Sequence, residues 1–284
     1  MDRVRFPDID ASAFVSDADR RALDALKAIP LLPTVVSKFY ELGLDRWMYV
    51  HNMANNVRCG PKQFSTLYEM LRESCDVLDM PEPELYVTNH PMSNAFAGGV
   101  ERPYITLRNS MIENLSDEQL YHLIGHELGH IKAGHVLYFS VAAVLIQLLE
   151  AIGRRTFGLG DVASLGLIMA FYEWSRQAEF SADRAGLLVS QSIETSLGAE
   201  LALAGGTHRF KGESNLEAFM DQARAYQDAS PADQIGKAIW FLLYGYQSTH
   251  PVAVLRAQHM ERWHQSGDYE KILAGDYAKV KKAS

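Results

Sequence analysis

The stretch that decides the fold is residues 121–135, YHLIGHELGHIKAGH. His126 and His130 are four residues apart, so on a helix their imidazoles lie one turn apart on the same face and can reach one metal ion. Glu127 is one position further round the helix. Its carboxylate would lie beside the metal rather than on it, where it can accept a proton from a water molecule. The HExxH pattern therefore predicts a zinc site that activates water, provided that the segment is helical.

The sequence around the motif favours a helix. Ser116 is a suitable N-cap, and Asp117 and Glu118 place acidic residues in the first turn. Apolar residues recur at helical spacing along one face, at Leu120, Leu123, Ile124, Leu128 and Ile131. The motif is therefore expected on a helix that buries one side.

The composition is that of a globular protein with a sizeable core. The chain has 284 residues, of which 48% are hydrophobic and 22% charged, and this excludes a disordered chain. The net charge of −8 is spread along the sequence, which favours solubility and argues against a nucleic-acid partner.

Cysteine usage and the N-terminus point to a reducing compartment. The two cysteines, Cys59 and Cys75, form no CxxC or Cys/His cluster, so neither a disulfide framework nor a cysteine zinc site is indicated. Residues 1–14 contain scattered charges and no apolar run of the length that a signal peptide needs. We expect a cytoplasmic protein.

Two kinds of local pattern precede the motif. Helices are predicted over 17–29, 34–42 and 62–78, from one-sided apolar stripes that end near prolines. After Pro81 and Pro83 the period changes to two, and short strands are predicted over 84–89, 94–98 and 102–107. We expect a small antiparallel sheet whose edge strand can pair with an extended peptide beside the metal.

The segment that follows the motif is unusually apolar. Residues 136–149 carry no charge, and a second uncharged run covers 162–172. A helix of the longer run would be only about 21 Å long, against a hydrocarbon layer of roughly 30 Å. A buried apolar helical hairpin is expected, with shallow membrane contact through 136–172 as the alternative.

Two nearby histidines do not complete the site. His122 lies eight residues before His130, about 12 Å along a helix axis, so His122, His126 and His130 cannot all bind one ion. The pattern HExxHxxGxxH would need a glycine at position 133 and a histidine at position 136, where the chain has Ala133 and Val136. His122 is expected as a wall or supporting residue, and His135 is not expected as a ligand.

A later carboxylate is the better third ligand. Glu179 and Asp183 are four apart in RQAEFSADRAG, residues 176–186, and so share a helix face. Glu179 would complete a site of two histidines and one glutamate. Asp183 would accept the free ring N–H of a ligand histidine and fix its tautomer. Glu173 is the alternative ligand.

Four motifs in this order resemble the HtpX-like and type I CAAX prenyl protease-like zinc metallopeptidases, a gluzincin group. They cover roughly residues 80–259 and are NAFA at 94–97, HELGH at 126–130, EFSAD at 179–183, and STHP at 248–251 followed by Arg256. The resemblance implies an α+β, mostly α fold and a metalloendopeptidase acting on proteins or peptides.

The resemblance also implies roles for individual residues. His126, His130 and Glu179 would hold one Zn²⁺ per chain, Glu127 would be the base, and His250 would approach the metal to stabilise the oxyanion or to occupy the open position. Residues implied to bind substrate are Asn94, Ala95, Phe96 and Arg256. We expect residues 1–80 to form an N-terminal helical segment packed on a metallopeptidase domain of residues 81–284.

Two other functions fit the same sequence. A zinc-holding binding or chaperone-like module would have its site closed by His250 or by the apolar segment and would show little turnover. A membrane-surface quality-control protease would use 136–172 as its contact, although many relatives have membrane-spanning segments where the apolar runs of this chain are short and interrupted. The oligomeric state is not readable from the sequence.

Overall fold

We describe the protein from a computed structural model. It covers residues 3–30, 32–142, 159–206, 212–228 and 252–281, together with residues 210, 230, 233, 234, 236 and 237, and of 159–168 only the backbone. His250 lies outside the described residues, and so do residues 143–158 of the expected apolar hairpin.

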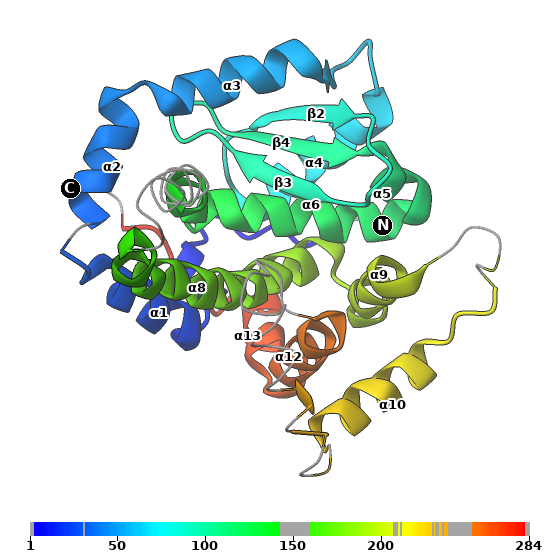
Figure 1. Cartoon of the computed structure of the whole chain (residues 1–284). Coiled ribbons are helices and arrows are strands. Elements are labelled where there is room, and N and C mark those ends of the chain that lie inside the picture. The colour runs from blue at the N-terminus through cyan, green and yellow to red at the C-terminus, as the bar shows by residue number, and fades with distance from the viewer. Residues whose placement is uncertain are drawn as a thin grey trace.

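The described chain is mostly helical and carries one small sheet (Figure 1). The first helices are α1 (Asp17–Lys27), α2 (Leu32–Glu41), α3 (Leu44–Asn55) and α4 (Ser65–Leu78). They correspond to the three predicted helices, with α3 as an addition that the sequence did not indicate. Further along are α5 (Asn109–Asn114), α6 (Asp117–Lys132), α8 (Leu159–Ser190), α9 (Ile193–Gly205), α10 (Leu216–Gln227), α12 (Ala253–Gln265) and α13 (Asp268–Leu273).

The sheet has four strands in the order β1-β2-β4-β3. They are β1 (Val57–Arg58), β2 (Glu84–Thr88), β3 (Ala95–Gly98) and β4 (Tyr104–Arg108). The outer pairs β1/β2 and β3/β4 are antiparallel, but β2 and β4 are parallel. The expectation of an antiparallel sheet is therefore corrected to a mixed sheet. The chain after β2 does not return to pair with β2 as β3. Instead β4 lies between β2 and β3, so β3 forms one edge of the sheet and β1 the other.

Helix α6 carries the HExxH motif and forms for identifiable local reasons. The Ser116 hydroxyl accepts a hydrogen bond from the Gln119 backbone N–H, and the Gln119 side chain accepts one from the Ser116 N–H. This reciprocal capping box satisfies two backbone donors that the first turn leaves free. The helix ends at Lys132, and Gly134 follows with a φ of +73°, a conformation that glycine adopts without strain.

Helices α6 and α8 approach closely because α6 carries glycine where they meet. A Cβ on Gly125 would lie 2.6 Å from Val189 Cβ, and a Cβ on Gly129 would lie 2.6 Å from Ala185 Cβ. Both separations are well below the roughly 3.5–4.0 Å of carbon atoms in contact. The two turns that carry His126 and His130 therefore lie directly against α8.

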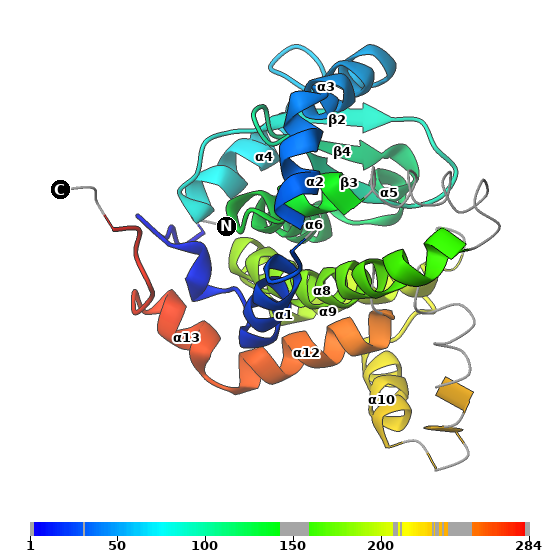
Figure 2. The same cartoon turned by 60° about the vertical axis from the view of Figure 1, so that its left-hand side comes forward.

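The N-terminal region shares its apolar contacts with the rest of the chain. Phe6, Ile9 and Phe14 are fully buried in the same cluster as Leu123 and Leu188. A second cluster joins α1 and α2 to α8 through side chains that include Leu26, Phe39, Phe171 and Trp174. In Figure 2 the sheet, α6, α8 and α12 form successive layers, and α1 lies against α8.

None of the helices in the described ranges combines the length and the apolar character that crossing a membrane requires. The bilayer core of about 30 Å would need about 20 consecutive apolar residues.

Candidate metal centre

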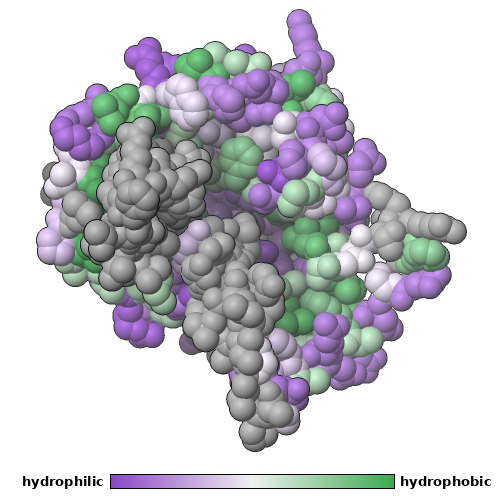
Figure 3. All heavy atoms as spheres, in the orientation of Figure 1, coloured by the Kyte–Doolittle hydropathy of each residue, from purple (hydrophilic) through white to green (hydrophobic). Residues whose placement is uncertain are grey.

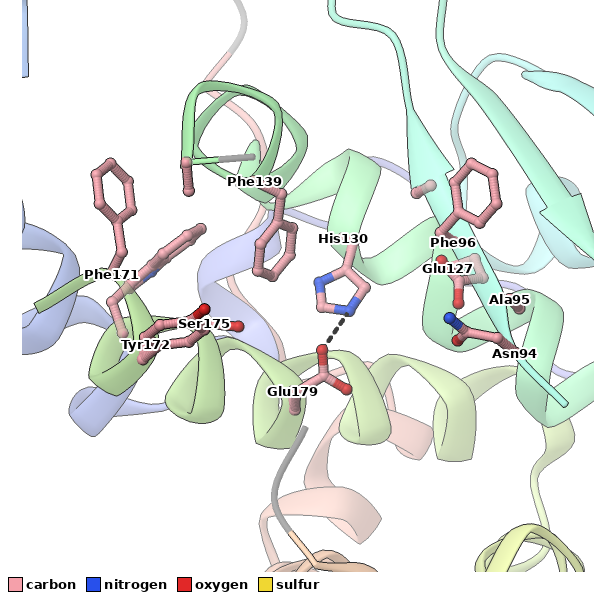
Figure 4. Close-up of a pocket in the computed structure, with 13 residues that line it drawn as sticks. Asn94, Ala95, Phe96, Glu127, His130, Phe139, Phe171, Tyr172, Ser175 and Glu179 are labelled. Atoms are coloured by element: carbon pink, nitrogen blue, oxygen red, sulfur yellow. Dashed lines mark ion pairs between the residues drawn. The ribbon is translucent and has the colours of Figure 1, made fainter. Parts of the chain in front are cut away.

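The structure brings together two histidines of α6 and one glutamate of α8. His126 Nε2 lies 3.1 Å from His130 Nε2 and 3.5 Å from Glu179 Oε2, and His130 Nε2 lies 3.4 Å from Glu179 Oε1. All three side chains are buried. In Figure 4 the imidazole of His130 points at the Glu179 carboxylate, and both side chains line the cavity.

These separations fit one tetrahedral ion. Bonds of roughly 2.0–2.1 Å to nitrogen and oxygen place neighbouring ligand atoms about 3.3–3.4 Å apart. The three separations between the side chains bracket that value. The donor set, two imidazole nitrogens and a carboxylate, is also one that zinc accepts. The residues present therefore fit a zinc ion, with the two distances to Glu179 measured to different oxygens of its carboxylate.

Asp183 supports the first of these histidines from α8. Its Oδ1 lies 2.9 Å from His126 Nδ1, so the imidazole N–H donates to the carboxylate and Nε2 is left to face Glu179. Arg256 of α12 in turn pairs with both oxygens of Asp183, with its Nε 3.0 Å from Oδ2. Burial alone would raise the pKa of Asp183, but the charges and hydrogen bonds of Arg256 and His126 together outweigh it and hold that pKa well below its usual range.

The second histidine has a different support. His130 Nδ1 lies 3.0 Å from His135 Nδ1, and His135 Nε2 lies 3.1 Å from Asp19 Oδ2. Asp19 comes from α1, at the other end of the chain, and is fully buried. His135 is thus not among the clustered ligand atoms, but it contacts one of the residues that supply them.

The charges around the site favour a dication. Burial lowers the pKa of both candidate ligand histidines, whereas the carboxylates raise it. At His126 the hydrogen bonds and charges of Asp183 and Glu179 prevail and raise the pKa to about 10. At His130 burial prevails and lowers the pKa to about 4. The carboxylates of Asp183 and Glu179 therefore place negative charge around His126, whereas the imidazole of His130 is neutral. Metal binding would replace the additional proton on His126.

A second cluster of possible ligands is already balanced by an arginine. His122, Asp183 and Glu200 also place ligand atoms within 4.8 Å of one another. The Arg256 guanidinium lies between the two acids, with its Nη2 3.1 Å from Glu200 Oε1. Burial raises the pKa of Glu200 to about 7. A metal ion would have to displace this buried cation.

Two cavities meet at the metal centre. The first, of about 290 Å³, is lined by aromatic side chains beside His130 and Glu179, and the second, of about 330 Å³, by Arg256, Glu200 and His126. Asn94, Ala95, Glu127 and Glu179 line both. Figure 3 shows this face of the molecule, where the surface is hollowed near the centre of the view and apolar side chains border the hollow.

The other residues singled out in the sequence occupy definite places. Asn94 and Ala95 line both cavities, and Phe96 lines the first from the edge strand β3. Arg256 lies behind His126, where it pairs with Asp183 and Glu200. Glu173 is not among the clustered ligand atoms, and its carboxylate pairs instead with Arg176 and Gln177 on the same helix.

Sequence reasoning missed several buried residues around the centre. Asp19, Ser181 and Trp174 form one hydrogen-bonded group in which both oxygens of the Asp19 carboxylate accept hydrogen bonds. Glu200 was missed as well. The motif spacing carries no signal for Asp19, because its contact with His135 joins residues 116 positions apart.

Comparison with known proteins agrees with this geometry. Two histidines and a distant glutamate form the ligand pattern of a metallopeptidase, and in such sites the glutamate of the HExxH motif lies beside the ligands. The sequence profile of peptidase family M48 matches residues 61–264, and the chain belongs to this family of metallopeptidases.

Similar proteins carry related names. The chain is 31% identical over 273 residues to the plastoglobule-localized metallopeptidase 48 of Arabidopsis thaliana, a match covering 94% of this chain and 77% of that protein. It is 30% identical over 109 residues to a protease HtpX homolog of Caldanaerobacter subterraneus, covering 37% and 36%. A protease HtpX homolog of Burkholderia lata is 26% identical over 194 residues, covering 57% and 67%. No solved structure matches significantly.

Proposed function

We propose that this protein is a zinc-dependent metalloendopeptidase that cleaves peptide bonds in proteins or peptides. The observation that carries the proposal is the set of three ligand side chains at tetrahedral separations, with Glu127 in the wall shared by both cavities. Membership of a metallopeptidase family supports it.

His126, His130 and Glu179 would hold the zinc ion, one per chain. When bound there, zinc would act as a Lewis acid toward the peptide carbonyl and would increase the acidity of water. Asp183 would keep His126 in the tautomer that presents Nε2. Arg256 would hold Asp183 ionised and in place, and a direct contact of Arg256 with substrate stays a prediction.

Glu127 would be the general base. It follows His126 on α6, is buried, and faces both cavities, and in Figure 4 its carboxylate points toward Asn94 at the start of β3. From this position it would accept a proton from the attacking water and pass it to the leaving amine. His250, outside the described residues, is proposed on the sequence resemblance alone to stabilise the oxyanion or to occupy the open metal position.

The edge strand β3 would bind the substrate as an added strand. Among the described residues β3 lies at an edge of the sheet, and its Ala95 lines both cavities. Antiparallel pairing, the more stable arrangement per residue, would run the peptide from the Gly98 end of β3 toward Asn94. Residues before the scissile bond would then lie over the first cavity, among Phe139, Phe171 and Trp174. A large apolar residue is the side chain that such a cavity favours.

Two assays test the proposal. Zinc-loaded wild-type protein should cleave a denatured protein substrate, and Glu127→Gln should retain zinc but lose hydrolysis. A binding module would instead hold peptide equally in both forms and cleave it in neither, which would overturn the proposal. Mapping the cut sites by mass spectrometry should show enrichment of large apolar residues before the cut, and an even distribution would contradict the assignment of the first cavity.

Localisation in the cytoplasm and a contact of 136–172 with a membrane remain sequence predictions. Flotation with liposomes would test the second one directly.

A further inference from the structure

The two proposed ligand histidines are supported in unequal ways. His126 donates directly to a carboxylate of the neighbouring helix, Asp183, at 2.9 Å. His130 instead contacts a third histidine, His135, which reaches a carboxylate of the N-terminal helix α1. That carboxylate, Asp19, lies outside residues 61–264, the part of the chain that the family profile matches.

The atoms in this chain allow only one order of protons among neutral imidazoles. Asp19 is a carboxylate and can only accept, so the His135 Nε2 that faces it at 3.1 Å carries the proton. His135 Nδ1 then carries a lone pair and accepts from His130 Nδ1, 3.0 Å away. His130 therefore has its proton on Nδ1, and its Nε2 lone pair faces Glu179. This is the tautomer that a metal ligand needs.

The chain of contacts is rigidly held. Asp19 is 0% exposed and His135 is 1% exposed. Trp174 Nε1 donates to Asp19 Oδ1 at 3.1 Å, and the Ser181 hydroxyl donates to Oδ2 at 2.6 Å. Both donors come from α8, the helix that carries Glu179. The His135 ring packs edge-on against Trp174, with centroids 5.7 Å apart. Neither the imidazole nor the carboxylate can turn away without breaking a buried hydrogen bond.

We propose that Asp19 and His135 are positioning residues of the metal centre, which fix His130 in the tautomer that presents Nε2 to the ion. The N-terminal helix α1 is then part of the centre. The inference rests on the proposed zinc site, because Asp19 and His135 can position a metal ligand only if His130 is one.

Zinc affinity in the full-length protein is the first test. Asp19→Asn and His135→Gln should each weaken zinc binding by about 10- to 100-fold, measured by competition with a chromogenic chelator. The double variant should bind no more weakly than His135→Gln alone, because both residues act through one contact. Asp17→Asn is the matched control, since Asp17 lies on the same helix but is exposed and forms a surface ion pair with Arg20. It should bind zinc as tightly as the wild type.

A second readout separates positioning from a general loss of stability. The visible absorption bands of the cobalt-substituted protein report the ligand field, and they should shift in Asp19→Asn. Ile272→Val, which trims a buried side chain on α13 that lines neither cavity of the metal centre, should lower the melting temperature and leave both zinc affinity and the cobalt bands unchanged.

The outcomes distinguish this inference from the proposed function. A wild type that binds no zinc would overturn both. A wild type that binds zinc, with Asp19→Asn equal to it in affinity and in cobalt spectrum, would overturn the positioning role and leave the peptidase proposal standing.

Discussion

Gly129 offers the sharpest test of how two helices build the metal site. Substitution by alanine would place a Cβ 2.6 Å from Ala185 Cβ and 3.2 Å from Ala182 Cα. Neither neighbour can move aside alone, because Ala182 Cα is a backbone atom and the Cβ of Ala185 is bonded directly to the backbone. The helices would have to separate by about 1 Å to reach ordinary carbon contact. Overpacking of this kind costs roughly 1–3 kcal/mol of stability.

The effect on the metal should exceed the effect on stability. Metal–ligand bonds tolerate about 0.2 Å of error, whereas a shift of about 1 Å would move Glu179 on α8 away from His126 and His130 on α6. We expect zinc affinity to fall at least about 10-fold in Gly129→Ala, measured by chelator competition alongside a thermal melt. Gly205→Ala is the control, because no atom of the described residues lies within 4 Å of a Cβ placed there. Wild-type zinc affinity in a Gly129→Ala protein with a lowered melting temperature would refute the reasoning.

Three further predictions follow from the same contacts. Asp183→Asn should weaken zinc binding by about 10- to 100-fold, again by chelator competition, and unchanged affinity would remove its role at His126. Arg256→Met leaves Asp183 and Glu200 without their buried cation and should cost about 3–5 kcal/mol in chemical unfolding, whereas the exposed Arg262→Met on the same helix should cost little. His122 is fully buried and its pKa is lowered by burial to about 3. His122 must therefore stay neutral in the folded protein, and its contribution to stability is fully present above pH 6.5. As the pH falls from 6.5 toward 3, the unfolded chain takes up a proton at His122 and the folded protein does not, so this contribution is lost. Between pH 7 and pH 5 the wild type should lose about 2 kcal/mol more than His122→Gln, with a chelator present in both, and parallel losses would contradict the assignment.

The local elements of the fold could be predicted because their signals are local. Ser116 and the acids after it mark the start of α6, and the spacing of Leu120, Leu123 and Ile124 marks its buried face. The change to a period of two predicts β2, β3 and β4 to within two residues at each end, whereas the two-residue strand β1 was not predicted. Helix α3 was missed because its hydrophobic residues form no clear stripe, and Trp47 and Met53 are in fact exposed.

The order of the strands could not be predicted in the same way. The alternation of apolar residues specifies which face of a strand is buried, but it is silent about which strand lies beside it. The Gly98-Gly99 turn does join β3 and β4 as an antiparallel pair. The parallel pairing of β2 with β4 depends on the path of the loop between β2 and β3, for which the sequence carries no recognisable signal.

The metal site shows the same division. The expectation that Glu179 and Asp183 share a face is a consequence of helix geometry, and both do point at the histidines of α6. The pairing of His135 with Asp19 depends on how α1 packs against α8, and the glycines of α6 act only through the approach of a second helix. Such contacts are products of the whole fold, so motif spacing could not reveal them.

The most direct test of the central claim is an anomalous difference map at the zinc edge, from crystals of the Glu127→Gln protein grown with one equivalent of zinc. Our account predicts a single peak about 2.0–2.2 Å from the Nε2 atoms of His126 and His130 and from a carboxylate oxygen of Glu179. A peak among His122, Asp183 and Glu200, or no peak at the three proposed ligands, would contradict it.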